Sequence, residues 1–274
     1  MEGKIDASQS KAAVELLARI EALGVPYGRE DSFKLAPGRL LADRLLIGVP
    51  ASSIRIDGTL AIGSTFGMPA AAEQLVTSRF GAANAVFFAT EESDVYRVFK
   101  LYLEFWDVVR ARVRAGDASP QLLHLGVKWD RARPDHFEEA HYTCVPLLGT
   151  QGVLQRMRAV LPPEAPAGAV GIAQDVVRLA ASRSSAPFLY MEVSETGNPR
   201  RSFDLNLYKS GLVVADAASQ LRSAAAHFGV AGEPFEAVLA RMQPMPLGHI
   251  AAGLDRRGAE FLSVYAEVAP LPAA

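Results

Sequence analysis

The sequence predicts an α+β protein in which ten antiparallel strands close into a β-barrel and helices pack around the outside. Two observations predict this fold class. Five pairs of segments with alternating apolar and polar residues are each divided by turn-forming residues, which is the pattern of β-hairpins. Segments with apolar residues at helical spacing lie between the pairs, so five helix–hairpin–helix units are expected. Because ten strands in an open sheet would leave two long unpaired edges, closure into a barrel is favoured.

Length and composition are those of a globular protein without a strong overall charge. The chain has 274 residues, of which 50% are hydrophobic and 21% are charged, and its net charge is −2. This charge, and the lack of any basic run, argue against nucleic acid and anionic membranes as partners. No stretch approaches the roughly 20 apolar residues of a membrane span, and the first residues do not form a signal peptide pattern. With a single cysteine as well, the sequence predicts one cytoplasmic domain over residues 1–274, and leaves the oligomeric state open.

The elements can be placed in order along the chain. The first is a helix that follows Ser8 or Ser10, either of which can cap it, and that ends at Gly24. The first hairpin is predicted over residues 52–63, where Asp57-Gly58 separates two short alternating runs. Four more hairpins are predicted over residues 84–105, 122–147, 188–209 and 249–268. Further helices are predicted over residues 69–80, 106–116, 150–161, 167–183, 215–228 and 233–242.

The alternation is clearest in the stretch FKLYLEFW over residues 99–106. Successive strand side chains point to opposite faces, so Lys100, Tyr102 and Glu104 share one face and the apolar residues share the other. If helices cover the apolar faces, the polar faces point into the barrel, and a barrel of this width has room for a ligand. The same parity places these further side chains inside: His124, Lys128, His141, Thr143, Tyr190, Glu192, Ser194, Ser202, Asp204, Asn206, Tyr208, His249, Ser263, Tyr265 and Glu267. The competing interpretation is an open sheet whose polar face is exposed to solvent.

The order of elements and one short strand motif resemble the ABBA aromatic prenyltransferases, the PT-barrel family. Members of that family commonly carry a Lys-x-Tyr pair on a barrel strand, and Lys100-Leu101-Tyr102 matches this pattern. The resemblance in element order covers nearly the whole chain. It implies that Lys100 and Tyr102 bind the diphosphate of a prenyl donor.

A later strand of the chain departs from the family pattern. Family members often carry Arg-x-Lys-x-Tyr there, or a lone inward tyrosine. Tyr208 and Tyr265 match the tyrosines, but Asp204 and Asn206 stand where the basic residues would be. A diphosphate needs several cations or Mg²⁺ to offset its charge. Either Mg²⁺ bridges acidic residues to the diphosphate, or the fold serves another ligand; no metal site made by protein side chains alone is predicted.

The resemblance implies an electrophilic aromatic substitution, in which an allylic prenyl group passes from its diphosphate to an electron-rich aromatic acceptor. Tyrosine rings would shield the allylic cation, and a carboxylate would orient the acceptor and accept the ring proton. The candidates for this carboxylate are Glu104, Glu192 and Asp204. The side chains implied to bind the two substrates are Lys100, Tyr102, Lys128, His141, Tyr190, Asn206, Tyr208 and Tyr265.

Two other interpretations stay open. A barrel of this kind can bind or modify an aromatic or lipophilic small molecule without prenylating it; what separates the two is whether cationic or Mg²⁺-binding groups converge around Lys100. An open α+β sheet used for protein interaction would instead expose Lys100, Asn206 and Tyr265 to bulk water. Other motifs are weak. The histidines of HFEEAH are five residues apart rather than four, and Cys144 is expected to be a buried core thiol.

Overall fold

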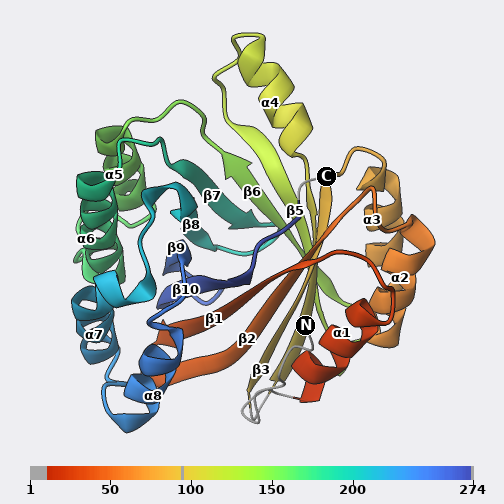
Figure 1. Cartoon of the computed structure of the whole chain (residues 1–274), viewed down its shortest axis with the longest axis horizontal. Coiled ribbons are helices and arrows are strands. Elements are labelled where there is room, and N and C mark those ends of the chain that lie inside the picture. Colours follow the sequence, from red (N-terminus) through yellow and green to blue (C-terminus); the bar gives the residue numbers. More distant parts are fainter. Residues whose placement is uncertain (1–10, 94–95, 273–274) are drawn as a thin grey trace.

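Ten strands of alternating sequence pair into a closed antiparallel barrel (Figure 1). The computed structural model describes residues 11–93 and 96–272. Each strand pairs with its neighbours along the chain, and β1 pairs with β10 to close the ring. The strands are β1 (Gly28–Ala36), β2 (Arg39–Pro50), β3 (Ala85–Ser93), β4 (Tyr96–Glu104), β5 (Gln121–Asp130), β6 (Phe137–Cys144), β7 (Leu189–Glu195), β8 (Arg201–Asn206), β9 (Leu247–Leu254) and β10 (Glu260–Ala269). The predicted fold class is confirmed, and the open-sheet interpretation is wrong.

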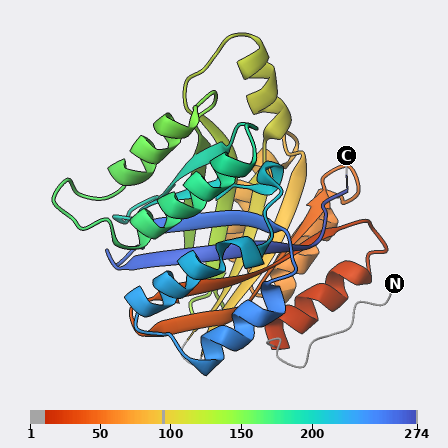
Figure 2. The same cartoon turned by 60° about the vertical axis from the view of Figure 1, so that its left-hand side comes forward.

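Helices lie outside the barrel, as their one-sided apolar patterns require (Figures 1 and 2). Those in the described part of the chain are α1 (Lys11–Glu21), α2 (Ile56–Thr65), α3 (Ala70–Phe80), α4 (Trp106–Arg114), α5 (Thr150–Ala159), α6 (Gly168–Arg183), α7 (Ala218–His227) and α8 (Glu233–Met242). Every predicted helix is present, although Ser8 and Ser10, the predicted caps of the first, lie outside the described residues. Among the described helices, none combines the length and the apolarity that crossing a membrane requires.

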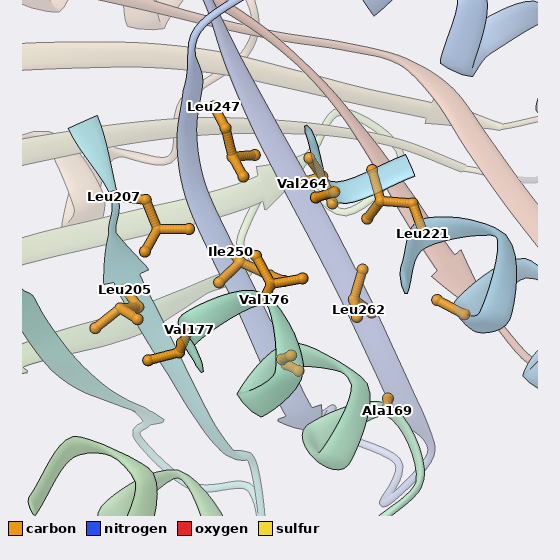
Figure 3. Packing of buried hydrophobic residues seen from close by; sticks show 14 of the residues in the cluster. Ala169, Val176, Val177, Leu205, Leu207, Leu221, Leu247, Ile250, Leu262 and Val264 are labelled. Carbon is orange, nitrogen blue, oxygen red and sulfur yellow. The ribbon is translucent and has the colours of Figure 1, made fainter. Parts of the chain in front are cut away.

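Two large apolar cores join most of the helices to the outer face of the barrel, and a smaller cluster lies beside α4. One core packs α5 to α8 against β7 to β10 and β1; in Figure 3, Val176 and Val177 of α6 lie beside Leu205 of β8 and Ile250 of β9. The other packs α1 to α3 against β2 to β5. Fully burying one such side chain contributes about 1.5–3 kcal/mol. Because these cores use the outer faces of the strands, the inner faces are left to line the lumen.

The first hairpin lies earlier in the chain than its pattern predicts. Residues 52–63 were the expected hairpin, but most of this stretch is helix α2, and the hairpin is formed by β1 and β2. Asp57 lies in the first turn of α2, where a carboxylate interacts favourably with the helix dipole, so the Asp-Gly pair begins a helix instead of a turn. The turn between β1 and β2 is Pro37-Gly38, and Gly38 has φ +65°, which glycine adopts without strain.

The other four predicted hairpins are present, and their register shows which side chains share the inner face. Residues directly opposite one another on paired strands lie on the same side of the sheet. Lys100 of β4 lies opposite Lys128 of β5, and Glu104 lies opposite His124. His124 in turn lies opposite Tyr142 of β6. The inner surface is therefore built from residues far apart in the sequence.

Candidate functional site

The inner faces of the strands enclose a cavity of about 350 Å³, toward the end of the barrel where β1 begins and β10 ends. This volume is in the range of small-molecule sites. The predicted site residues that line it are Lys100, Tyr102, Glu104, Asp204, Asn206, Tyr208 and Tyr265. Three groups of side chains and the separate carboxylate of Glu104 stand out in this lining, and each has a different chemistry.

Two cations and a carboxylate form the first group, which we call the cationic end. Arg44 of β2 and Lys100 of β4 flank Glu91 of β3, so three adjacent strands bring them together. Arg44 Nε and Lys100 Nζ donate to the same carboxylate oxygen of Glu91, at 3.0 Å and 2.8 Å. Arg44 also donates to the Tyr265 hydroxyl at 3.3 Å. A guanidinium and an ammonium therefore converge at one place in the cavity wall.

The protonation of the cationic end follows from its burial and its charges. Burial lowers the pKa of Lys100 to about 8; Glu91 opposes this shift, and nearby Arg44 and Lys34 add to it. Burial alone would raise the pKa of Glu91, but Lys100, Arg44 and Lys34 hold it well below its usual range. At neutral pH the Arg44 guanidinium and the Lys100 ammonium thus face one ionised carboxylate, a surplus of one positive charge. Such a surplus favours an anion as ligand.

Aromatic rings form the second group, the aromatic belt of Phe87, Tyr102, His124 and Tyr142. The Tyr102 and Tyr142 rings meet edge to face at 5.6 Å, and His124 contacts Tyr142 and Phe87 in the same manner, each at 5.8 Å. Burial lowers the pKa of His124 to about 4, so this ring is neutral at pH 7. Electron-rich ring faces attract cations. The belt can therefore stabilise a positive charge in the cavity and also pack against an aromatic ligand.

A charged histidine and its carboxylate partners form the third group. His249 Nδ1 lies 2.7 Å from Asp204 Oδ1, and His249 Nε2 lies 3.2 Å from the Asn206 amide. The Tyr208 hydroxyl donates to Glu30, whose carboxylate lies near the same imidazole. Burial alone would lower the pKa of His249, but the charge and hydrogen bond of Asp204, with further carboxylates nearby, raise it to about 9. Asp204, which stands where the family carries a basic residue, thus stabilises the positive charge of His249.

Glu104 stands apart from these pairs. It lines the cavity, and its carboxylate has no hydrogen-bond or ion-pair partner among the described residues. Burial raises the pKa of Glu104 to about 7, an effect that the nearby His249 charge partly offsets. A carboxylate with a pKa near neutrality suits general base catalysis at physiological pH. Of the three carboxylates considered from the sequence, Glu104 lines the cavity unpaired, Asp204 lines it but binds His249, and Glu192 lies outside the barrel.

Charged side chains fill the lumen beyond the cationic end. Lys128 faces inward, as predicted, but it binds Glu195 of β7 and does not line the cavity. Arg200 Nη1 lies 2.7 Å from the same carboxylate, and Arg256 Nε lies 3.7 Å from it. The Glu195 side chain is 0% exposed and that of Lys128 is 3% exposed. These ion pairs give Lys128 a structural role in place of the predicted contact with substrate.

We expect Glu195→Ala to destabilise the fold by about 3–5 kcal/mol, because it leaves buried cations without their shared partner. The measurement is the free energy of unfolding in urea. Glu192→Ala is the matched control, since Glu192 and its partner Arg156 are each about two-fifths exposed, at 42% and 41%. An exposed pair of this kind contributes about 0–1 kcal/mol. Equal free energies of unfolding for the two variants would contradict the structural role.

Two predicted site residues on β7 lie outside the barrel. Tyr190 is fully buried in the core under the helices, and Glu192 binds Arg156 of α5 at 2.7 Å. The inner face of β7 is instead its apolar face, since Met191 lines the cavity opposite Asp204. The prediction that Tyr190 and Glu192 face the lumen is therefore corrected. Its premise, that the apolar face of every strand packs against helices, does not hold for this strand.

His141 is also displaced from its predicted position in the lumen. One regular register runs from Trp129 opposite Phe137 to His124 opposite Tyr142, so Tyr142 shares the inner face with His124. His141 then points to the other side of β6, where its Nε2 lies 2.7 Å from a carboxylate oxygen of Glu139. The inner face of β6 is thus the one that carries Ala140 and Tyr142, so Tyr142 takes the place predicted for His141 in the cavity wall.

The lining residues that the sequence did not indicate come mainly from β1 and β2. Arg44 and Glu30 lie in the hairpin whose position was predicted wrongly. The sequence of β1 does contain a strand signal that could have located this hairpin. Its residues Glu30, Ser32 and Lys34 alternate with Asp31, Phe33 and Leu35. The lumen is also more cationic than the sequence predicted, because Arg44 and Arg200 lie in it as well.

Comparison with known proteins identifies the architecture. No protein-family model matches the sequence, and no curated protein matches it. Among solved structures, 5-dimethylallyltryptophan synthase from Streptomyces coelicolor matches 95% of this chain and 92% of its own, with a TM-score of 0.60 and 13% identity. The chain has the PT-barrel fold. The apo form of the prenyltransferase PriB matches 97% of this chain and 94% of its own, with a TM-score of 0.60 and 15% identity.

A third PT-barrel structure contains two ligands. It is 6-dimethylallyltryptophan synthase from Micromonospora olivasterospora in complex with DMASPP and Trp. It matches 88% of this chain and 81% of its own, with a TM-score of 0.55 and 13% identity. At these identities the comparisons establish the fold that this chain shares with aromatic prenyltransferases.

Proposed function

We propose that the protein is an aromatic prenyltransferase, which transfers an allylic prenyl group from its diphosphate to an electron-rich aromatic ring inside the barrel. One observation carries the proposal: a single cavity combines the cationic end, the aromatic belt and the unpaired carboxylate of Glu104. These are the groups that a diphosphate, an allylic cation and a departing ring proton require. The PT-barrel fold supports the proposal by analogy.

The donor diphosphate binds at the cationic end. Arg44 and Lys100 already hold one carboxylate, Glu91, and a diphosphate offers the same two donors more negative charge. When the carbon–oxygen bond of the donor breaks, its electron pair stays on the diphosphate. The two cations stabilise that developing charge, which is where an enzyme gains most from fixed electrostatics.

The allylic cation that remains lies beside the aromatic belt. Each ring face that contacts it contributes about 0.5–2 kcal/mol. A π-electron pair of the acceptor forms the new carbon–carbon bond, and the acceptor ring then carries the positive charge. Glu104 accepts the proton from the substituted ring carbon, which restores aromaticity and balances the charge. Tyr102 lies between the cationic end and the proposed base. On β4 it is two residues from Lys100 and two residues from Glu104, so the three side chains share the inner face.

Mg²⁺ is part of the proposal as a companion of the diphosphate. The described residues hold no group of three or more His, Cys, Asp or Glu side chains suited to a metal. Mg²⁺ is often bound by one or two carboxylates together with substrate phosphates. Glu91, the carboxylate between Arg44 and Lys100, fits that arrangement, and the ion would supply further neutralisation of phosphate charge.

A second candidate function is a barrel that binds a neutral aromatic or lipophilic molecule without prenylating it. The observation that favours it is that Glu91 already offsets part of the charge of Arg44 and Lys100. A neutral ligand would leave these three side chains paired. The two candidates differ in whether any diphosphate binds.

Calorimetric titration of dimethylallyl, geranyl and farnesyl diphosphates, each with Mg²⁺ and with a chelator, tests the proposal. Saturable binding of at least one donor is expected, tighter with Mg²⁺. The relative affinities would also rank the prenyl chain lengths. If no diphosphate binds under either condition, the transferase proposal is wrong and the second candidate takes its place.

A further inference from the structure

Two glycines on inner strand faces lie directly opposite aromatic side chains of the cavity. Gly126 of β5 is the cross-strand partner of Tyr102, and Gly48 of β2 is the partner of Phe87. A glycine inside a strand weakens it and often marks a close approach of another group. Here the approaching groups are two rings of the aromatic belt.

The space over each glycine is taken by the side of a ring. A Cβ at Gly126 would lie 2.7 Å from Cδ1 and 2.8 Å from Cε1 of Tyr102. A Cβ at Gly48 would lie 2.7 Å from Cε1 and 3.0 Å from Cδ1 of Phe87. Two bonded ring atoms at nearly equal distance mean that each ring lies across the neighbouring strand. The rings thus cover the barrel wall, which leaves more of the lumen open.

Gly126 is the simpler of the two positions. Apart from the Tyr102 ring, the next atom that a Cβ at Gly126 would meet is the Ala140 methyl, at an ordinary contact distance of 3.5 Å. A Cβ at Gly48 would also lie 3.1 Å from Leu271, which is a tight contact. A side chain at Gly126 must therefore displace Tyr102. Because β5 lies behind the ring, the free direction for Tyr102 is toward the cavity axis.

We propose that Gly126 is a specificity-determining residue that sets the size of aromatic acceptor the chamber admits, by letting Tyr102 lie against β5. The inference rests on the proposed function for the identity of the ligand as an acceptor, although the size effect itself concerns binding. Tyr102 moves into the chamber when Gly126 gains a methyl group, and the room for a fused ring system is lost before the room for a single ring.

The test is a calorimetric binding series with phenol and 1-naphthol, on the wild type, Gly126→Ala and Gly81→Ala. Gly81 is a matched control, because it has an ordinary helical backbone and a Cβ there meets nothing within 4 Å. In Gly126→Ala, 1-naphthol affinity is expected to fall about tenfold or more, while phenol affinity changes by about twofold or less. Gly81→Ala should bind both rings as the wild type does.

A double substitution shows whether the effect passes through Tyr102. In a Tyr102→Ala background, Gly126→Ala should no longer change 1-naphthol affinity. Equal weakening of both rings by Gly126→Ala, a persistent effect in that background, or a wild type that binds neither ring would each overturn the inference. Thermal unfolding of each variant separates a folding defect from a binding defect, and Tyr102→Ala alone gives a second test because it should favour the larger ring.

Failure of the proposed function would look different. Size-dependent aromatic binding without any diphosphate binding would leave the role of Gly126 intact and remove the transferase. If a diphosphate binds but Gly126→Ala does not change the affinity for either aromatic ring, the transferase proposal stands and the role of Gly126 is wrong.

Discussion

Lys100→Ala is expected to weaken the binding of a prenyl diphosphate by about 10- to 150-fold. The Lys100 ammonium lies at the cationic end, and a hydrogen bond to a charged group contributes about 1.5–3 kcal/mol. Arg44→Ala should have an effect in the same range, since the two side chains hold the same carboxylate oxygen. The measurement is the dissociation constant of the best donor by calorimetry.

The matched control for this prediction is Lys209→Ala. Lys209 is an exposed lysine just after β8, so its removal changes the net charge equally without touching the cavity. Donor affinity that falls equally in both variants would indicate a general charge effect. Donor affinity unchanged in Lys100→Ala would place the diphosphate elsewhere and contradict the assignment of the cationic end.

Glu104→Gln is expected to lower kcat by about 10²–10⁴-fold while donor affinity stays near that of the wild type. The amide keeps the shape of the side chain but cannot take the ring proton. Glu104 must be ionised to act as a base, and burial raises its pKa to about 7. The wild-type kcat should therefore rise with pH through about 7, and this limb should be missing from the pH profile of Glu104→Gln.

Glu192→Gln serves as its control, because Glu192 lies on the outer face of β7 and pairs with α5. It should keep the wild-type kcat and the same pH limb. If Glu192→Gln lost activity and Glu104→Gln did not, the choice of base and the inward face of β7 would both be wrong. If neither lost activity, Asp204 would be the next carboxylate of the cavity to test.

The sequence was sufficient for four of the five hairpins because each combines turn residues with strands in which polar and apolar residues alternate. In the β1–β2 hairpin only β1 shows that alternation. On β2 the inner face carries Leu46 and Gly48, so apolar residues occupy both sides of the strand and no alternation results. The Pro37-Gly38 pair marked the turn, but an Asp-Gly pair nearby gave a similar signal within a helix.

The cavity residues were predictable wherever polar residues face inward, as Lys100, Tyr102 and Glu104 do. The same rule failed on β7, where Met191 faces the cavity and Glu192 meets an arginine of the surrounding helices. The alternation of residues along one strand shows which side chains share a face. It does not show which of the two faces points into the barrel. That choice depends on pairing with β6 and β8 and on a helical partner far along the chain, which a single sequence does not show.

Product formation is the decisive test of the proposed prenyl transfer. The protein is incubated with dimethylallyl diphosphate, Mg²⁺ and a set of phenolic and indolic acceptors, and the products are analysed by mass spectrometry, with Lys100→Ala alongside. We expect an acceptor whose mass has increased by one prenyl group in place of one hydrogen, with release of an equal amount of diphosphate and loss of both in the variant. A wild type that binds donor and acceptor together, yet leaves every acceptor unmodified and the donor intact, would contradict the proposed transfer.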